Sequence, residues 1–433
     1  MFDWIVRNLF GPRMMHSKEQ IEGMAVKAYL DSCDFNGFPV RALRGDNQAL
    51  QASVIELIAN RRIDLVRGDY HPNPHIKAFE SEPAEEQIEK IHKDGLGAGC
   101  LYPTPALLAA IDLGRDLSAK PYTLELSRGA AQLSHRAFDL RVLEWYRNDP
   151  RYRYSVDDVH GQIAIRDEFR NDKQVNPKDT LELFRFGFAY NNEMFRAVAV
   201  FLRDLHGLIP EHQTLLRGYD LGEGYQLHPD FYRNAILGEW SERVSIYDAF
   251  LAEKYHINEM SRLMGKPPLF RTEYRDHKRP HGFGILIRPT LKELRDFTLL
   301  LDQLLSDDID RAFFEDDIPV SEVLTKADGT EIKQPIGTIT LLEQWLGANF
   351  RSADKEAPGD VIKAIRKVRS ARQKPAHKIE DNQFEQKYLL EQRDLIVAAF
   401  DAVRTIRMIL ENHSNVRGYK VPNYLREAKV WSR

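Results

Sequence analysis

The chain has very little cysteine and no long apolar run. Its 433 residues include two cysteines, Cys33 and Cys100, which cannot build a disulfide framework or a cysteine-based zinc site. No stretch approaches the roughly 20 apolar residues of a membrane-spanning helix. The first segment carries Asp3 and Arg7 inside its apolar run, which is not typical of a signal peptide. We therefore expect a cytoplasmic protein without membrane contact.

Glycine, proline and net charge are also unremarkable, and each excludes a class of protein. The 25 glycines and 21 prolines are too few for a collagen-like or low-complexity chain, and a hydrophobic content of 43% excludes general disorder. The formal charge of −4 means that any contact with nucleic acid must come from a local basic patch. The length favours about two or three domains.

The common catalytic motifs are missing. The sequence contains no G-x-x-x-x-G-K-[ST] phosphate loop, no G-x-G-x-x-G dinucleotide loop and no G-x-S-x-G nucleophile elbow. His71 and His75 are four positions apart, but the prolines around them deny the helix that would aim both at one metal ion, and His277 and His281 share this objection. We therefore expect no metal site and no cofactor.

The N-terminal region, residues 1–80, predicts a winged helix-turn-helix-like module. Ser17 and Asp46 each precede a stretch with helical apolar spacing, a shorter helix lies between the two, and a strand-like alternation follows. This order is typical of winged helices, which contact DNA or protein, while a purely structural domain remains open. The candidate DNA-binding residues are Arg61 and Arg62.

The remaining chain predicts two helical domains, so the expected fold class is mainly α. Residues 81–285 form the helical middle domain, because aromatic and aliphatic residues from Leu183 to Leu202 follow a 3.6-residue period that is typical of a core-facing helix. Residues 286–433 carry the apolar stripes of four helices, which predict a four-helix bundle. Asp328-Gly329 predicts a β-hairpin inserted into that bundle.

The most informative stretch is DVIKAIRKVRSARQKPAHKIEDN. Its apolar stripe runs through Val361, Ile365 and Val368, and the next member of the stripe is Arg372. An arginine on an apolar face requires a carboxylate, a phosphate or a break in the core. Because a proline at 375 disfavours helix at the preceding residue, His377 emerges just beyond the helix end. The surrounding basic residues include Arg366, Arg369, Lys374 and Lys378.

An arginine and a histidine spaced as in Arg372–His377, ahead of a long closing helix, resemble the motif of the HEPN superfamily. Its members are small helical bundles, many of them metal-independent ribonucleases of bacterial toxin and antiviral defence systems. The resemblance covers at most residues 288–413. Many active members carry Asn, Asp or His inside the motif, whereas this chain has Gln, Lys, Pro and Ala, so RNA cleavage and RNA binding without cleavage both remain open.

The resemblance implies roles for the residues of this stretch. Arg372 would stabilise charge on a phosphate and His377 would transfer a proton, while Arg366, Arg369, Lys374 and Lys378 would bind the RNA backbone. Two bundles commonly form a composite site in this family, which implies a homodimer or a partner bundle. Two alternatives stay open: a non-catalytic sensor or scaffold that binds protein or DNA through the N-terminal module, and an unfamiliar enzyme with its site in the middle region.

Overall fold

The fold is mixed α/β, with about 51% helix and 17% strand, so the expected high helix content is present but the chain is not clearly mainly α. A computed structural model describes residues 16–31, 35–67, 82–111, 119–170, 172, 175–179, 181–182, 184–275, 278–325, 330–350, 356–373 and 381–432. None of the described helices has the length and hydropathy that crossing a membrane requires.

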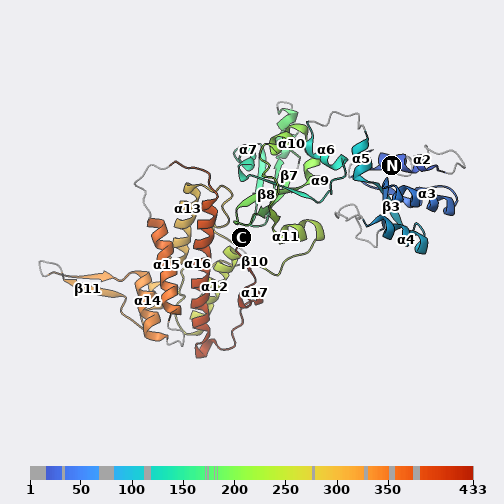
Figure 1. Ribbon diagram of the computed structural model, residues 1–433. Coiled ribbons are helices and arrows are strands. Elements are labelled where there is room, and N and C mark those ends of the chain that lie inside the picture. Colours follow the sequence, from blue (N-terminus) through green and yellow to red (C-terminus); the bar gives the residue numbers. More distant parts are fainter. Residues whose placement is uncertain are drawn as a thin grey trace. The chain divides into compact units, whose positions relative to one another are not determined.

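The chain packs into two compact units, whose elements are labelled in Figure 1. Unit 1 consists of residues 1–156, 160–189 and 197–227. Unit 2 consists of residues 157–159, 190–196 and 228–433. The division into domains 1–80, 81–285 and 286–433 stays a prediction.

The first part of unit 1 is a small α/β module. Its helices and strands are α2 (Lys18–Asp31), β1 (Phe38–Pro39), η1 (Val40–Ala42), α3 (Asn47–Ala59), β2 (Ile63–Arg67), α4 (Ala84–Asp94) and β3 (Gly99–Pro103). The strands form an antiparallel sheet in the order β1-β3-β2. The predicted caps are confirmed: Ser17 and Gln20 exchange hydrogen bonds at the start of α2, and Asp46 accepts from Ala49 N at the start of α3.

The core of this module extends past residue 80. Ile21, Val54 and Ile58 from α2 and α3 pack in one cluster with Ile91 from α4 and Leu101 from β3. The helix α4 lies in the sequence between β2 and β3, where a winged helix has a short connection, and the sequence did not predict β3. The winged-helix-like character of the module therefore stays a prediction.

The second part of unit 1 is built around a six-stranded sheet in the order β4-β8-β7-β6-β5, with β9 pairing with β7. Its elements are α5 (Pro105–Ala110), α6 (Pro121–Ser127), β4 (His135–Phe138), η2 (Leu140–Leu143), α7 (Glu144–Arg147), β5 (Tyr152–Val156), β6 (His160–Ile165), α8 (Asp167–Arg170), η3 (Pro177–Asp179), β7 (Phe184–Tyr190), β8 (Arg196–Phe201), α9 (Leu202–His206), α10 (Pro210–Arg217) and β9 (Gln226–Leu227).

This sheet overturns the expectation of a helical middle domain over residues 81–285. Within the stretch that predicted a helix, residues 184–201 contain the neighbouring strands β7 and β8. Nearly every residue of both strands is buried, so both faces of the sheet are covered and β8 shows no apolar–polar alternation. A stretch of mostly apolar residues matches a helical stripe as well as a strand, although three phenylalanines of β7 alternate with Arg185 and Gly187. The turn at Asn191, whose side chain accepts from Glu193 N and Phe195 N, is the missed signal.

Unit 2 is largely a helical bundle. Its elements are α11 (Pro229–Tyr232), η4 (Arg233–Leu237), β10 (Val244–Ser245), α12 (Ile246–Leu263), α13 (Leu291–Asp302), η5 (Gln303–Asp307), η6 (Arg311–Phe313), β11 (Ser321–Thr325), β12 (Glu331–Pro335), α14 (Thr338–Asn349), α15 (Ala357–Gln373), α16 (Lys387–Glu411), η7 (Ser414–Val416), α17 (Asn423–Arg426) and β13 (Val430–Trp431). The short strands β10 and β13 pair in parallel.

The four helices predicted for this region, α13 to α16, are confirmed, and α12 joins them (Figure 1). The apolar stripe of α16 is buried, and Arg407 in the same helix forms a buried ion pair with Glu253 of α12. The predicted hairpin is present as the antiparallel pair β11 and β12, while Asp328-Gly329 lies outside the described residues. This bundle positions the end of α15, where the candidate site lies.

Candidate functional site

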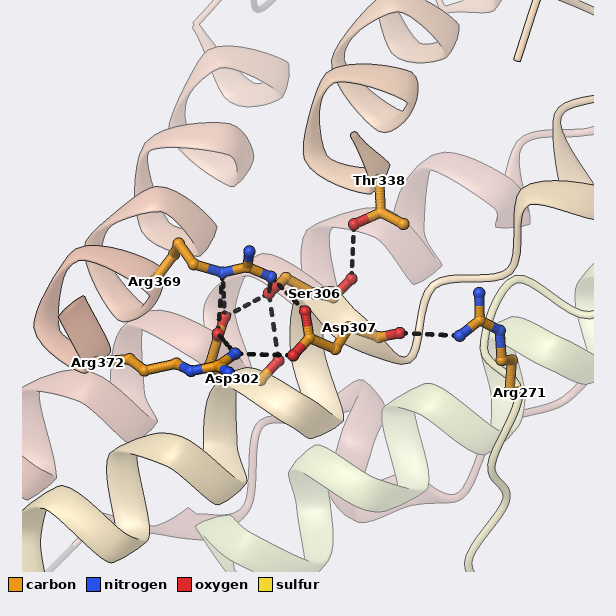
Figure 2. Close-up of polar contacts among 7 residues, drawn as sticks. All are labelled: Arg271, Asp302, Ser306, Asp307, Thr338, Arg369 and Arg372. Carbon is orange, nitrogen blue, oxygen red and sulfur yellow. Dashed lines mark hydrogen bonds and ion pairs between the residues drawn. The ribbon is translucent and has the colours of Figure 1, made fainter. Parts of the chain in front are cut away.

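The candidate site lies where the C-terminal end of α15 meets the end of α13. The α-helical part of α13 ends at Asp302, and the chain continues as one π-helical turn, η5. A π-helical turn is wider than an α-helical turn, so residues four and five positions apart share a face. Asp302, Ser306 and Asp307 consequently point together toward α15 (Figure 2).

Two arginines of α15, here called the arginine pair, contact this turn. Arg369 Nε lies 2.9 Å from Asp302 Oδ2, and its Nη2 donates to Ser306 Oγ at 2.7 Å and to Asp307 Oδ1 at 2.5 Å. Arg372 Nη1 donates to Asp302 Oδ2 and to Asp307 Oδ2, both at 2.7 Å. Each aspartate therefore bridges both guanidinium groups, as Figure 2 shows.

The two aspartates differ in their exposure. The side chain of Asp302 is 0% exposed, and it also accepts a hydrogen bond from Ser306 Oγ, whereas Asp307 is 43% exposed. Burying an ionised carboxylate is unfavourable unless it is paired and hydrogen-bonded, so Asp302 requires both arginines. The hydrogen bonds that Arg372 donates to Asp302 and Asp307 raise the pKa of Arg372 above its ordinary value, and this guanidinium stays charged.

The backbone of the π-helical turn is held from two further elements. Thr338 Oγ1 at the start of α14 donates to the carbonyl oxygen of Ser306 at 2.8 Å. Arg271 Nη1 donates to the carbonyl oxygen of Asp307 at 3.2 Å. These bonds satisfy carbonyl groups that the end of a helix leaves without intrahelical partners, and they fix the turn beneath the arginine pair (Figure 2).

Part of each guanidinium group remains available. The side chains of Arg369 and Arg372 are 30% and 34% exposed. Among the described residues, no hydrogen bond engages Arg369 Nη1 or the Nε and Nη2 atoms of Arg372. The site thus combines N–H donors that have no partner among the described residues with two positive charges that two aspartates balance.

Arg372, which lies on the apolar stripe and therefore requires a partner, is paired with carboxylates. Of the other predicted RNA-binding residues, Arg369 joins the same site, whereas Arg366 pairs with Glu343 of α14 at 2.5 Å on an exposed face. His377, Lys374 and Lys378 lie outside the described residues. The structure therefore brings together Arg369 and Arg372 from the predicted set.

The two candidate DNA-binding residues lie just after α3. Arg62 forms two hydrogen bonds with the carboxylate of Glu22 in α2, at 2.8 and 2.6 Å. Arg61 is exposed and adopts a left-handed backbone conformation with φ of 52°. One of the two cations is thus engaged within the module itself, and DNA contact by Arg61 and Arg62 stays a prediction.

Sequence reasoning missed the acidic half of the site. Neither Asp302 nor Asp307 is among the candidate residues named from the sequence. A usable signal existed, because Asp302 follows Thr298 by four positions on the buried stripe of α13. A buried acid on one bundle helix is the natural partner of an arginine on the apolar stripe of another.

The described residues contain no group of three or more His, Cys, Asp or Glu side chains that could hold a metal ion. The arrangement offers a pair of fixed cations with N–H donors that no other described group engages, which suits a phosphate group. Comparison with protein-family models, with curated proteins and with solved structures gave no match to the chain.

Proposed function

We propose that the chain binds single-stranded RNA at the end of α15 and cleaves it there without a metal ion. The observation that carries this proposal is the arginine pair, whose two adjacent guanidinium groups present N–H donors that no group in the described part of the chain engages. A planar guanidinium can bind two oxygens of one phosphate, and two such groups side by side can follow an RNA backbone.

The chemistry would use the RNA's own 2′-hydroxyl. As a base removes its proton, O2′ attacks phosphorus, the P–O2′ bond forms and the P–O5′ bond breaks. The departing O5′ takes up a proton, which leaves a 2′,3′-cyclic phosphate and a 5′-hydroxyl. Arg372 and Arg369 would stabilise the negative charge that grows on the phosphate oxygens in the transition state. No metal ion enters this sequence of steps.

Proton transfer would fall to His377, which lies outside the described residues and follows Arg372 by five positions. The ordinary pKa of histidine, about 6.5, lets the side chain accept and donate a proton near neutral pH. This role comes from the resemblance to the HEPN superfamily, which also supplies the proposal of a toxin or antiviral defence effector. A second copy of the chain is the partner that the family's composite site implies.

The two aspartates support this proposal in different ways. Buried Asp302 holds both guanidinium groups in one orientation, and preorganised charge is more effective than charge that must rearrange. Exposed Asp307 is an anion that contacts the arginine pair where a phosphate would bind. Its side chain can rotate toward the solvent when the phosphate binds. Asp302 is thus the fixed element of the site, and Asp307 is the group that RNA would displace.

The test compares variants of the full chain on a labelled single-stranded RNA in excess EDTA. Arg372→Ala and His377→Ala should each abolish cleavage, and Arg372→Ala should also weaken RNA binding. Lys292→Ala, which removes an exposed cation from α13, is the matched control and should behave like the wild type. Wild-type cleavage that is retained by both variants, or that disappears in EDTA, contradicts the proposed mechanism.

A non-catalytic scaffold is the second candidate, and one observation favours it. The charges of Asp302 and Asp307 already balance those of the arginine pair, as expected for an ion-pair network that only stabilises the bundle. On this proposal the N-terminal module would bind protein or DNA. It predicts that Arg372→Ala lowers the stability of the chain and changes no RNA binding, whereas Arg61→Ala weakens a complex with duplex DNA or a protein.

A further inference from the structure

A second polar site lies in unit 2, away from the arginine pair. It is a cavity of about 140 Å³ between the start of α11, the π-helical turn η4, the loop before β10 and the strand β13. The residues that matter here are Asp230, Asn234, Trp240, Arg243 and Trp431. None of them takes part in the ion-pair network at the end of α15.

The floor of the cavity consists of hydrogen-bond acceptors. Asp230 is 4% exposed, and Trp431 Nε1 donates to its Oδ2 atom. No ion pair in the described part of the chain neutralises this buried carboxylate, which leaves its other oxygen available to a donor. The side-chain oxygen of Asn234 is buried and has no partner among the described residues. Buried acceptors without donors are unfavourable, so a ligand that brings N–H groups would be stabilised here.

The walls and mouth are aromatic and cationic. The pairing of β10 with β13 fixes Trp431, and the Arg243 guanidinium lies 4.5 Å from the centre of its ring. Trp240 is 83% exposed, which is unusual for the largest apolar side chain. Exposed tryptophan beside a cation is typical of sites that stack a nucleobase and bind the phosphate attached to it.

We propose that this cavity binds the base of a guanine nucleotide. Guanine presents adjacent donors, N1–H and the N2 amino group, on one edge of its six-membered ring, and these match the carboxylate of Asp230 and the oxygen of Asn234. Adenine has an acceptor at N1 on the same edge and leaves one of these oxygens unpaired. The base would stack on Trp240, and Arg243 at the mouth would bind the phosphate.

The size of the cavity agrees with this ligand. A protein cavity of about 150 Å³ accommodates benzene, so 140 Å³ holds one six-membered ring. The five-membered ring of the purine and its sugar would then lie at the mouth, next to Trp240 and Arg243. The same chemistry fits a free guanine nucleotide and an unpaired guanosine in RNA. The proposal is independent of RNA cleavage at the end of α15.

The experiment measures quenching of tryptophan fluorescence in the full chain by GMP, AMP, XMP and argininamide, and by a short single-stranded RNA with one guanosine. GMP should quench with saturation and bind at least tenfold more tightly than AMP. A higher affinity for the RNA identifies guanosine in RNA as the source, and a higher affinity for GMP identifies the free nucleotide. No quenching by guanosine in either form, equal affinity for AMP, or preference for argininamide overturns the proposal.

Two variants keep the test specific. In Asp230→Asn an amide N–H replaces one carboxylate oxygen, so the variant should bind GMP at least tenfold more weakly. It should bind XMP more tightly, because xanthine carries an oxygen in place of the N2 amino group and that oxygen can accept from the new N–H. A merely structural role of Asp230 does not predict this exchange. Trp240→Ala should weaken GMP binding without changing the melting temperature, and Asp296→Asn on the exposed face of α13 is the matched control.

Discussion

Replacing Asp307 with asparagine should strengthen RNA binding. The carboxylate of Asp307 lies against both guanidinium groups and is 43% exposed, so it competes with a phosphate for the same donors. Removing it changes the net charge of the network from zero to +1. A unit charge about 4 Å away contributes about 1 kcal/mol in water and about 4 kcal/mol at an effective dielectric constant of 20. We expect a gain of about 1–2 kcal/mol, that is, roughly 5- to 30-fold tighter binding.

The assay is fluorescence anisotropy of a 5′-labelled single-stranded RNA at several salt concentrations. For a single strand, each added phosphate contact steepens the plot of log K against the logarithm of the salt concentration by about 0.7. Asp307→Asn should therefore show a steeper slope than the wild type. Asp296→Asn makes the same charge change on the exposed face of α13 and serves as the control. If the two variants bind RNA equally, the arginine pair is not the phosphate site and the reasoning fails.

Three further predictions concern stability, measured by urea unfolding. Asp302→Asn should lower the free energy of unfolding by about 2–3 kcal/mol, because it leaves the arginine pair without its buried carboxylate. Gly161→Ala should cost about 1–3 kcal/mol, because the new methyl group meets the ring of Phe186 on the neighbouring strand. Burial and the nearby Arg407 lower the pKa of His256 to about 4, so the wild type should lose roughly 2–4 kcal/mol between pH 7 and pH 4, and His256→Gln should lose less.

The sign of the last prediction follows from the proton balance. The unfolded chain binds a proton at His256 near pH 6.5. The folded chain binds it only near pH 4, because the ring is buried, contacts Tyr419 and lies near the charge of Arg407. Stability is therefore fully present above pH 6.5 and declines as the pH falls through this window. An unchanged difference between the wild type and His256→Gln at pH 7 and pH 4.5 would contradict the assignment.

Local rules predicted the parts of the fold that depend on a few neighbouring residues. Ser17 and Asp46 cap helices where the sequence predicts helix starts, since a cap needs only the next three residues. The stripe of α16 is buried as its 3.6-residue period indicated. Arg372 lies on its stripe with the charged partner that its position demanded.

The rest depends on contacts between distant segments. The strands β7 and β8 are buried almost throughout, so apolar residues occupy both faces of β8 and its sequence lacks the alternation that would distinguish it from a helix. The pairing of Asp302 with residues of α15 follows from the packing of two helices that lie almost 70 positions apart. The cavity around Asp230 needs Trp431, about 200 positions later, to form its wall. No local sequence pattern encodes contacts between segments that lie so far apart in the chain.

The central claim is that the end of α15 handles a phosphate of RNA without metal. The most direct measurement identifies the ends of the RNA fragments that the full chain produces in excess EDTA. The account predicts 2′,3′-cyclic phosphate and 5′-hydroxyl ends with the wild type, and intact RNA with Arg372→Ala and with His377→Ala. RNA left intact by the wild type, or fragments carrying 5′-phosphate ends, would contradict it.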